Sequence, residues 1–438
     1  MKKLPVIEII LVILGSLLYF FANLQRTAVP GAVFTLLQND LNAPAQNIAS
    51  LGSSFMYVYA VSQLFIGILT ARYGGFRVIR TGAVLFFAGS LLFPLSDSFV
   101  LLYLSRILTG IGSAGFYLAM IYEIRKIVPH KNFGVVLSFV LLIGYLGAIA
   151  ANAPLVICIN NLGWRKVFFL TAVISGLTAL LFILTDKFAH KQPVDKTVRL
   201  NFNLFRQVFS NKRNINLYLF ACFNYALYFV MQTVLGKKFL EDFCGMTVIN
   251  AAMILSIMGF LYAIAGSVIA FISRLTLNRR TIYLRFAALN TLFTFAAIFI
   301  CIVFNITVPV IPVILFCLIA FMASLSPLLV PLLHDINGDK LSSCAVSVMT
   351  CGFFISAGLF GNTAGFFLDL FKDNSAYAAI FAVFAAFAAV SCFNVFKIEE
   401  SAKTKRILHY VKVHNRIEPE DSPEHWHDKY EHDLYNNV

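Results

Sequence analysis

Stretches of about 20 mainly apolar residues recur along the chain from Val6 to Phe396, with short polar segments between them. A helix needs roughly this length of apolar sequence to cross the hydrocarbon core of a bilayer. Hydrophobic residues make up 59% of the 438 positions and charged residues only 13%, which is too apolar for a surface covered by water. We therefore expect an all-α integral membrane protein embedded in a lipid bilayer.

Twelve candidate transmembrane helices can be counted. They cover residues 6–34, 51–71, 78–96, 100–123, 133–158, 166–185, 214–236, 247–273, 281–304, 307–333, 341–368 and 375–396. An even number of helices places the two ends of the chain on the same side of the membrane.

The distribution of basic residues indicates which side that is. If the N-terminus is cytoplasmic, 27 of the 34 Lys and Arg residues lie on the cytoplasmic side. Only five lie opposite: Arg165, Lys166, Lys237, Lys238 and Lys372. Because positive segments resist translocation, we expect both termini in the cytoplasm. The net charge of +13 does not indicate nucleic-acid binding, since the basic residues lie between apolar segments and form no basic face with stacking aromatics.

The longest hydrophilic segment between apolar stretches separates the sixth from the seventh. It predicts a six-helix half at residues 1–185, a cytoplasmic central loop at 186–213, a second six-helix half at 214–396 and a flexible cytoplasmic tail at 397–438. The pattern G-x-x-G occurs in the fifth stretch (Gly144, Gly147) and again in the eleventh (Gly358, Gly361). This repetition indicates either duplicated halves around a central pathway or only close helix packing.

No metal or cofactor is expected. The eight Cys residues lie in or beside apolar segments without C-x-x-C spacing, which is typical of buried thiols. His425, His427 and His432 have the chemistry of metal ligands, but the polar tail around them offers no core to hold a site.

A recognisable motif stands between the second and third stretches. It reads Gly67-Ile-Leu-Thr-Ala71-Arg72-Tyr-Gly74-Gly75-Phe-Arg77. This sequence resembles the signature loop of the major facilitator superfamily, G-x-L-x-D-R-x-G followed by basic residues. It departs from the pattern at Ala71, where the family usually has Asp.

The resemblance implies roles in gating for several residues of this loop. Gly67 would permit close helix contact, Gly74 a tight turn, and Arg72 and Arg77 would hold cytoplasmic helix ends together by charge-assisted bonds. Since Ala71 cannot pair with them, Glu123 is the nearest acidic residue that could. The alternative for Glu123 is an ordinary surface carboxylate.

Other segments are also similar to the family. They are Arg106-Ile-Leu-Thr-Gly110-Ile-Gly112 (family R-x-x-x-G-x-G), Gly144 to Gly147 with Asn152-Ala-Pro154 (a degenerate G-x-x-x-G-P) and Gly163-Trp164-Arg165, which resembles bacterial members. The resemblance implies two six-helix halves, secondary transport by alternating access, no enzymatic activity, a monomer and a bacterial inner membrane.

Two basic residues fall well inside predicted helices, Arg26 and Arg106, and a charge in the hydrocarbon is a functional candidate by default. Tyr19, Asn23 and Arg26 share one helix face, so we expect Arg26 to bind an anion; the alternative is a structural Arg that bonds to backbone carbonyls. For Arg106 the alternatives are substrate contact, proton relay and a structural tie between helices.

The second half offers a matching polar face. Tyr225, Tyr228 and Gln232 have the spacing i, i+3, i+7, which suits either hydrogen bonds to a substrate or aromatic packing. No carboxylate is predicted at mid-membrane. The buried Arg residues therefore predict transport of a small anionic or zwitterionic organic metabolite, by proton symport, exchange or simple facilitation.

Two other classes of protein remain as alternatives. A transporter-like ligand sensor would bind without flux, and the change at Ala71 leaves this open. A polytopic membrane enzyme would require clustered catalytic groups, such as paired aspartates or a His-rich set, and the sequence contains neither.

Overall fold

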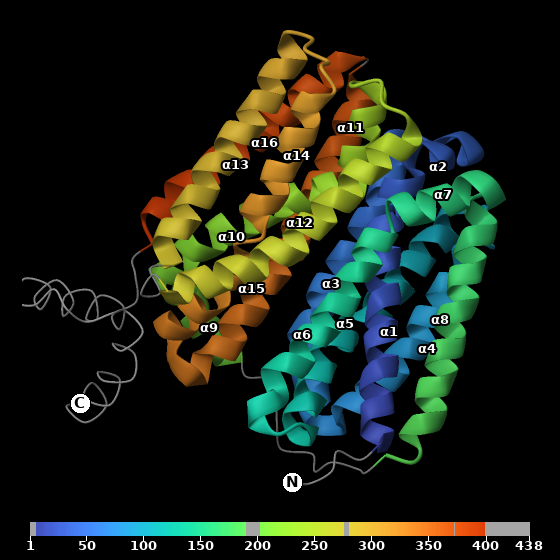
Figure 1. Cartoon of the computed structure of the whole chain (residues 1–438), viewed down its shortest axis with the longest axis vertical. Coiled ribbons are helices and arrows are strands. Elements are labelled where there is room, and N and C mark those ends of the chain that lie inside the picture. The colour runs from blue at the N-terminus through green and yellow to red at the C-terminus, as the bar shows by residue number, and fades with distance from the viewer. Residues whose placement is uncertain (1–5, 190–201, 276–279, 372, 399–438) are drawn as a thin grey trace, which may run out of the picture.

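The computed structural model describes residues 6–189, 202–275, 280–371 and 373–398, and in this part of the chain it is helical throughout (Figure 1). Twelve of the helical segments there are long and apolar enough to cross a membrane, which confirms the predicted number. The N-terminal elements are α1 Val6–Ala28, η1 Gly31–Val33, α2 Phe34–Leu41, α3 Ala45–Tyr73, α4 Gly75–Leu92, α5 Phe99–Ile127, α6 His130–Ala150, α7 Ala153–Leu162 and α8 Trp164–Asp186.

The C-terminal elements begin with a short helix that precedes the seventh span. They are α9 Phe202–Ser210, α10 Lys212–Val230, η2 Met231–Leu235, α11 Gly236–Asp242, α12 Val248–Leu275, α13 Arg280–Val303, α14 Val310–Ala323, η3 Ser326–Leu328, α15 Leu329–Leu370 and α16 Asn374–Phe396. The helix α15 contains a kink at Gly338, whose φ of 64° favours glycine, and the tenth and eleventh spans meet there.

The spans form two six-helix halves, α1 to α8 in one and α10 to α16 in the other (Figure 1). Two clusters of buried apolar side chains lie within one half each, and the largest cluster draws residues from both halves. The first turn of α1 lies toward one end of the molecule, and α2, α7 and α11 lie toward the other (Figure 1). Because the largest buried cluster draws residues from both halves, the two halves share a buried core.

The first predicted helix, residues 6–34, is too long. The structure ends α1 at Ala28 and continues through the short turn η1 into the separate helix α2. Pro30 explains the difference, because proline lacks the backbone N–H that would continue the hydrogen-bond ladder and its ring clashes with the preceding turn.

The fifth predicted helix, residues 133–158, is broken as well. In the structure α6 ends at Ala150 and α7 begins at Ala153, with Pro154 in its first turn. Proline is tolerated at the start of a helix but not inside one, so the Asn152-Ala-Pro154 segment ends α6.

The predicted central loop, 186–213, contains a helix, α9. Residues 190–201 of that loop lie outside the described part of the chain, as do residues 1–5 and 399–438 with the three tail histidines. The repeated G-x-x-G pairs lie against helices of the first half: Gly144 and Gly147 against α1, and Gly358 and Gly361 against α3.

Candidate functional site

Arg26 lies in the last turn of α1, where both halves surround it with aromatic rings. Its guanidinium carbon is 5.9 Å from the ring centre of Tyr59 in α3. From the other half, the rings of Phe229 in α10 and Phe354 in α15 lie at 5.1 and 5.5 Å. Rings at these distances attract a cation through their negative faces.

The charge of Arg26 has no acidic partner among the described residues. Its Nη2 donates a hydrogen bond to Oδ1 of Asn23, whose own amide donates to the carbonyl of Tyr19 at 2.8 Å. Asn23 therefore orients the guanidinium. The Nε of Arg26 is buried and makes no hydrogen bond, so one edge of the guanidinium fork remains available to an acceptor.

Tyrosine side chains from both halves continue this cluster. Four of them lie near Arg26: Tyr19, Tyr59, Tyr225 and Tyr262. Tyr228 stacks on Tyr262 with ring centres 4.7 Å apart. The structure thus brings the predicted tyrosines of α1 and α10 into one cluster with Arg26.

Sequence reasoning missed four members of the cluster. Tyr59 and Tyr262 neighbour Arg26, Tyr117 stacks on Tyr19 at 5.4 Å, and Tyr145 contacts Tyr262 edge to face at 5.7 Å. Each lies in a long, mainly apolar helix that shows no polar face directed at Arg26 in the sequence. Only the packing of α3, α5, α6 and α12 around α1 and α10 reveals these positions.

Gln232 lies in η2, one turn after Tyr228, where a short π-helix interrupts the seventh span. Single π-helical turns in α-helices often mark functional sites. The amide nitrogen of Gln232 donates to the carbonyl of Leu255 in α12 at 3.1 Å, and its buried Oε1 accepts no hydrogen bond. Gln232 therefore contributes an unpaired acceptor beside the Tyr228–Tyr262 pair.

We define the Arg26 cluster as Arg26, Asn23, Gln232, the seven tyrosines Tyr19, Tyr59, Tyr117, Tyr145, Tyr225, Tyr228 and Tyr262, and the rings of Phe229 and Phe354. It contains one charged side chain and draws on both halves.

Arg106 has a different environment. It is fully buried in α5, and its three nitrogens donate to backbone carbonyls: Nε to Leu51 at 3.3 Å, and Nη1 and Nη2 to Gln25 and Val29 at 3.4 Å each. The carbonyls of the last helical turn have no partner within the helix. Arg106 therefore supplies hydrogen-bond donors to backbone carbonyls where α1 ends, and it joins this end of α1 to α3 and α5.

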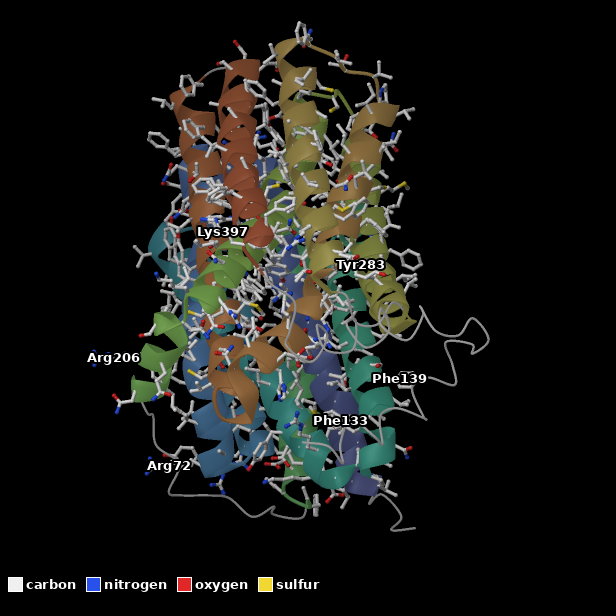
Figure 2. All side chains as sticks on the ribbon, turned by 90° about the vertical axis from the view of Figure 1, so that its left-hand side faces the viewer. Arg72, Phe133, Phe139, Arg206, Tyr283 and Lys397 are labelled. Carbon is white, nitrogen blue, oxygen red and sulfur yellow. The ribbon has the colours of Figure 1, made fainter. Side chains whose placement is uncertain are left out.

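The signature loop differs in part from expectation. Gly74 has a φ of 90° between α3 and α4, a turn that favours glycine. The close contact expected at Gly67 is absent, because a Cβ built there would have no neighbour within 4 Å. Arg72 and Arg77 are exposed and form no ion pair with any described residue; Figure 2 shows Arg72 near the end of the bundle.

Glu123 does not replace the missing carboxylate as a partner of these arginines. It is buried at the end of α5, and its Oε1 accepts hydrogen bonds from the backbone N–H groups of Gly75 at 2.5 Å and Phe76 at 3.3 Å. These groups form the first turn of α4, whose N-cap Gly74 has no side chain. Glu123 therefore caps α4, because a carboxylate is stabilised at a helix N-terminus.

The Gly163-Trp164-Arg165 segment forms a polar junction at the end of the molecule that carries α2. Arg165 binds Asp40 at 3.1 Å and Asp97 at 2.6 Å, and the indole N–H of Trp164 donates to Asp40 at 3.1 Å. This junction joins α2, α8 and the connection before α5. No group of three potential metal ligands occurs in the described part of the chain.

Known proteins resemble this chain in sequence and in fold. A family model of the Major Facilitator Superfamily matches residues 15–316. A chloroplastic ascorbate transporter of Arabidopsis thaliana is 26% identical over 188 residues, which are 42% of this chain and 34% of that protein. The multidrug efflux pump SdrM of Staphylococcus aureus is 25% identical over 196 residues, 43% of this chain and 42% of the pump. The chain thus spans less than half the length of either relative.

The fold matches over a longer range. A crystal structure of a D-xylose-proton symporter superposes with a TM-score of 0.72 over 92% of this chain and 99% of that chain, at 15% identity. These relatives are transporters, so the alternative of a membrane enzyme is not supported. The family match runs from the first span into the tenth and so covers more than half of the chain, and this protein therefore belongs to the Major Facilitator Superfamily of membrane transporters.

Proposed function

We propose that this protein moves a small organic anion or zwitterion across the membrane by alternating access, with Arg26 as the residue that binds the negative charge. The observation that carries the proposal is the position of Arg26 between the two halves without an acidic partner. Arg26 is half-buried, and a cation withdrawn from water without a counter-ion is costly. An anionic substrate would remove that cost and would also accept a hydrogen bond from the unpaired Nε of Arg26.

The rest of the Arg26 cluster would hold the body of the substrate. Tyr19 lies beside Arg26 in the first half, and Tyr225, Tyr228 and Gln232 approach from the second. A site built from both halves is what alternating access needs, because movement of one half against the other then exposes the same ligand to either side.

The contacts between the halves indicate which state the structure represents. Hydrogen bonds that join described residues of the two halves lie toward the end with α2, α7 and α11, as between Asp369 and the first turn of α3. If both termini are cytoplasmic, this end faces outward and the state is inward-facing. We further propose that the protein is a monomer in a bacterial inner membrane.

The names of the two relatives support different substrates. Ascorbate is an anion at neutral pH, which agrees with binding by Arg26. The multidrug efflux pump is the second candidate type, and the many aromatic rings of the Arg26 cluster favour it. The two types differ in whether the charge of Arg26 is required.

A ligand screen on purified protein tests the proposal. Organic anions, amino acids, neutral sugars and cationic drugs are compared by thermal shift, since a ligand at 100 times its Kd stabilises a folded protein by about 2.7 kcal/mol. Arg26→Ala should weaken anion binding by about 10- to 100-fold, as expected for loss of a hydrogen-bonded charge. The control is Arg206→Ala, which removes an exposed charge on α9 (Figure 2).

Flux into proteoliposomes completes the test. Uptake of a hit by the wild type, with loss in Arg26→Ala, supports an anion transporter, and dependence on a pH gradient would identify proton coupling. Binding without flux would instead identify a ligand sensor. Equal transport by the wild type and by Arg26→Ala would refute Arg26 as the anion site.

A further inference from the structure

The contents of the Arg26 cluster restrict the substrate further, provided that the proposed function holds. Its one full charge is Arg26, and none of its members is acidic. A substrate with one negative charge is therefore neutralised. A dianion would leave a second charge without a partner, and the ammonium group of a zwitterion would meet a guanidinium and no carboxylate.

The rings of the cluster favour a flat substrate. Tyr225 stacks nearly parallel on Phe229 at 5.5 Å and on Phe353, which borders the cluster, at 4.7 Å, with interplanar angles of 29° and 28°. Tyr228 and Tyr262 are parallel within 13°. Stacked rings of this kind gain additional energy from a further planar ring in offset or edge contact, which a puckered aliphatic ring cannot make.

Unpaired polar atoms indicate a third requirement. Within the described part of the chain, the hydroxyl groups of Tyr117, Tyr225 and Tyr228 make no hydrogen bond. By contrast, the Tyr262 hydroxyl lies 3.3 Å from Ser326. Tyr228 is buried and Tyr117 and Tyr225 are half-buried, and tyrosine hydroxyls withdrawn from water usually find a partner. The unpaired Oε1 of Gln232 adds an acceptor beside Tyr228.

We infer that the substrate is a hydroxylated aromatic monocarboxylate. Its carboxylate would bind the free edge of Arg26, its ring would lie among the rings of the cluster, and its hydroxyl would donate to Gln232 and accept from Tyr225 or Tyr228.

A matched set of small probes separates the three requirements in a thermal-shift assay on the full-length protein. The probes are 4-hydroxybenzoate, benzoate without the hydroxyl, cyclohexanecarboxylate without the planar ring, terephthalate with two negative charges, and 4-(aminomethyl)benzoate as a zwitterion. We expect 4-hydroxybenzoate to bind most tightly, about fivefold more tightly than benzoate for one additional hydrogen bond. The other three probes should bind more weakly than benzoate.

Phenylalanine variants test the hydroxyl groups while they keep the rings. Tyr225→Phe and Tyr228→Phe together should weaken the binding of 4-hydroxybenzoate more than that of benzoate. The preference should become smaller without vanishing, because Gln232 still accepts from the hydroxyl. Tyr73→Phe is the control, because Tyr73 is 44% exposed at the end of α3, and it should change neither affinity.

The outcomes distinguish this inference from the proposed function. If cyclohexanecarboxylate, terephthalate or the zwitterion binds as tightly as 4-hydroxybenzoate and depends on Arg26, the substrate class is wrong and the anion site stands. If the 2-, 3- and 4-hydroxybenzoates all give no shift while another anion does, the same conclusion follows. If neutral 4-hydroxybenzyl alcohol matches 4-hydroxybenzoate and Arg26→Ala changes neither, both proposals fail.

Discussion

Arg26 and Arg106 are both basic residues inside apolar segments, but different groups surround them. Their partners come from distant parts of the chain: carbonyls of α1 and α3 for Arg106, and aromatic rings of α3, α10 and α15 for Arg26. The sequence therefore predicts that these residues matter, and only the packing separates their environments.

Arg106→Lys tests the structural role of that arginine. A lysine ammonium cannot replace a planar group that donates to three carbonyls at once. We expect the Val29 carbonyl to lose its partner, whereas the Gln25 carbonyl keeps the N–H of Val29 and the Leu51 carbonyl keeps the Ser54 hydroxyl. We expect unfolding to become easier by about 1–3 kcal/mol, the usual cost of an unsatisfied buried polar group. The measurement is the melting temperature in detergent.

Arg26→Lys provides the comparison, because Arg26 has only Asn23 as a hydrogen-bond partner among the described residues and its replacement should lower the melting temperature less. If Arg106→Lys keeps the wild-type melting temperature and loses anion binding, Arg106 contacts the substrate and the structural assignment is wrong.

At the scale of elements, the twelve spans could be predicted because a bilayer demands a fixed length of apolar helix. The breaks at Pro30 and at Asn152-Ala-Pro154 could not be predicted with confidence, since proline is tolerated inside many membrane helices when a neighbour satisfies the freed backbone groups. Here those neighbours are Arg106 for α1 and Ser256 for α6, and neither is near the break in sequence.

Ser256 bridges the break between α6 and α7 from the opposite half. Its hydroxyl accepts from the N–H of Ala153 at 3.0 Å and donates to the carbonyl of Ile149 at 3.3 Å, two groups that would bond to each other in a continuous helix. Ser256→Ala leaves the Ala153 N–H without a partner, whereas the Ile149 carbonyl still accepts from the N–H of Asn152. The variant should destabilise the protein by about 1–3 kcal/mol, measured as a lower melting temperature. Ser256→Thr, which keeps the hydroxyl, should restore most of the loss.

Ser175→Ala is the matched control. The hydroxyl of Ser175 bonds to a carbonyl three residues earlier in its own helix, so its removal leaves the helix ladder intact. If Ser175→Ala lowers the melting temperature as much as Ser256→Ala does, the bridge contributes nothing specific.

At the scale of the whole molecule, the two halves meet along α3 and α15. The Ser53 hydroxyl donates to the Gly358 carbonyl at 2.8 Å, and the amide of Asn362 donates to the Tyr57 hydroxyl at 3.1 Å. The two halves could be predicted from the sequence, because the hydrophilic segment that separates them is visible in the composition. The sequence did not predict which helices meet between them, since that depends on shape complementarity between segments about 300 residues apart.

Asp369 joins the two halves where the contact between α3 and α15 reaches the first turn of α3. Its two carboxylate oxygens accept from the N–H groups of Ala45 and Gln46, each at 2.8 Å, and so cap α3, whose own N-cap Pro44 provides no side-chain bond. Alternating access requires these contacts to break when the site opens toward this end. Asp369→Asn removes the charge and one of the two acceptors, which should weaken the cap by about 1 kcal/mol.

A loss of this size should shift the balance between states by roughly fivefold toward separation of the halves at this end. The measurement is the rate at which a maleimide modifies Asn362→Cys, in a Cys158→Ser background because Cys158 is exposed. Asp369→Asn should raise the rate, whereas Asp97→Asn should not, because Asp97 pairs with Arg165 inside the first half. Equal rates in Asp369→Asn and the wild type would mean that this cap does not hold the halves together. Equal acceleration by Asp369→Asn and Asp97→Asn would mean that the net charge at this end, rather than the cap, sets the balance between the two states.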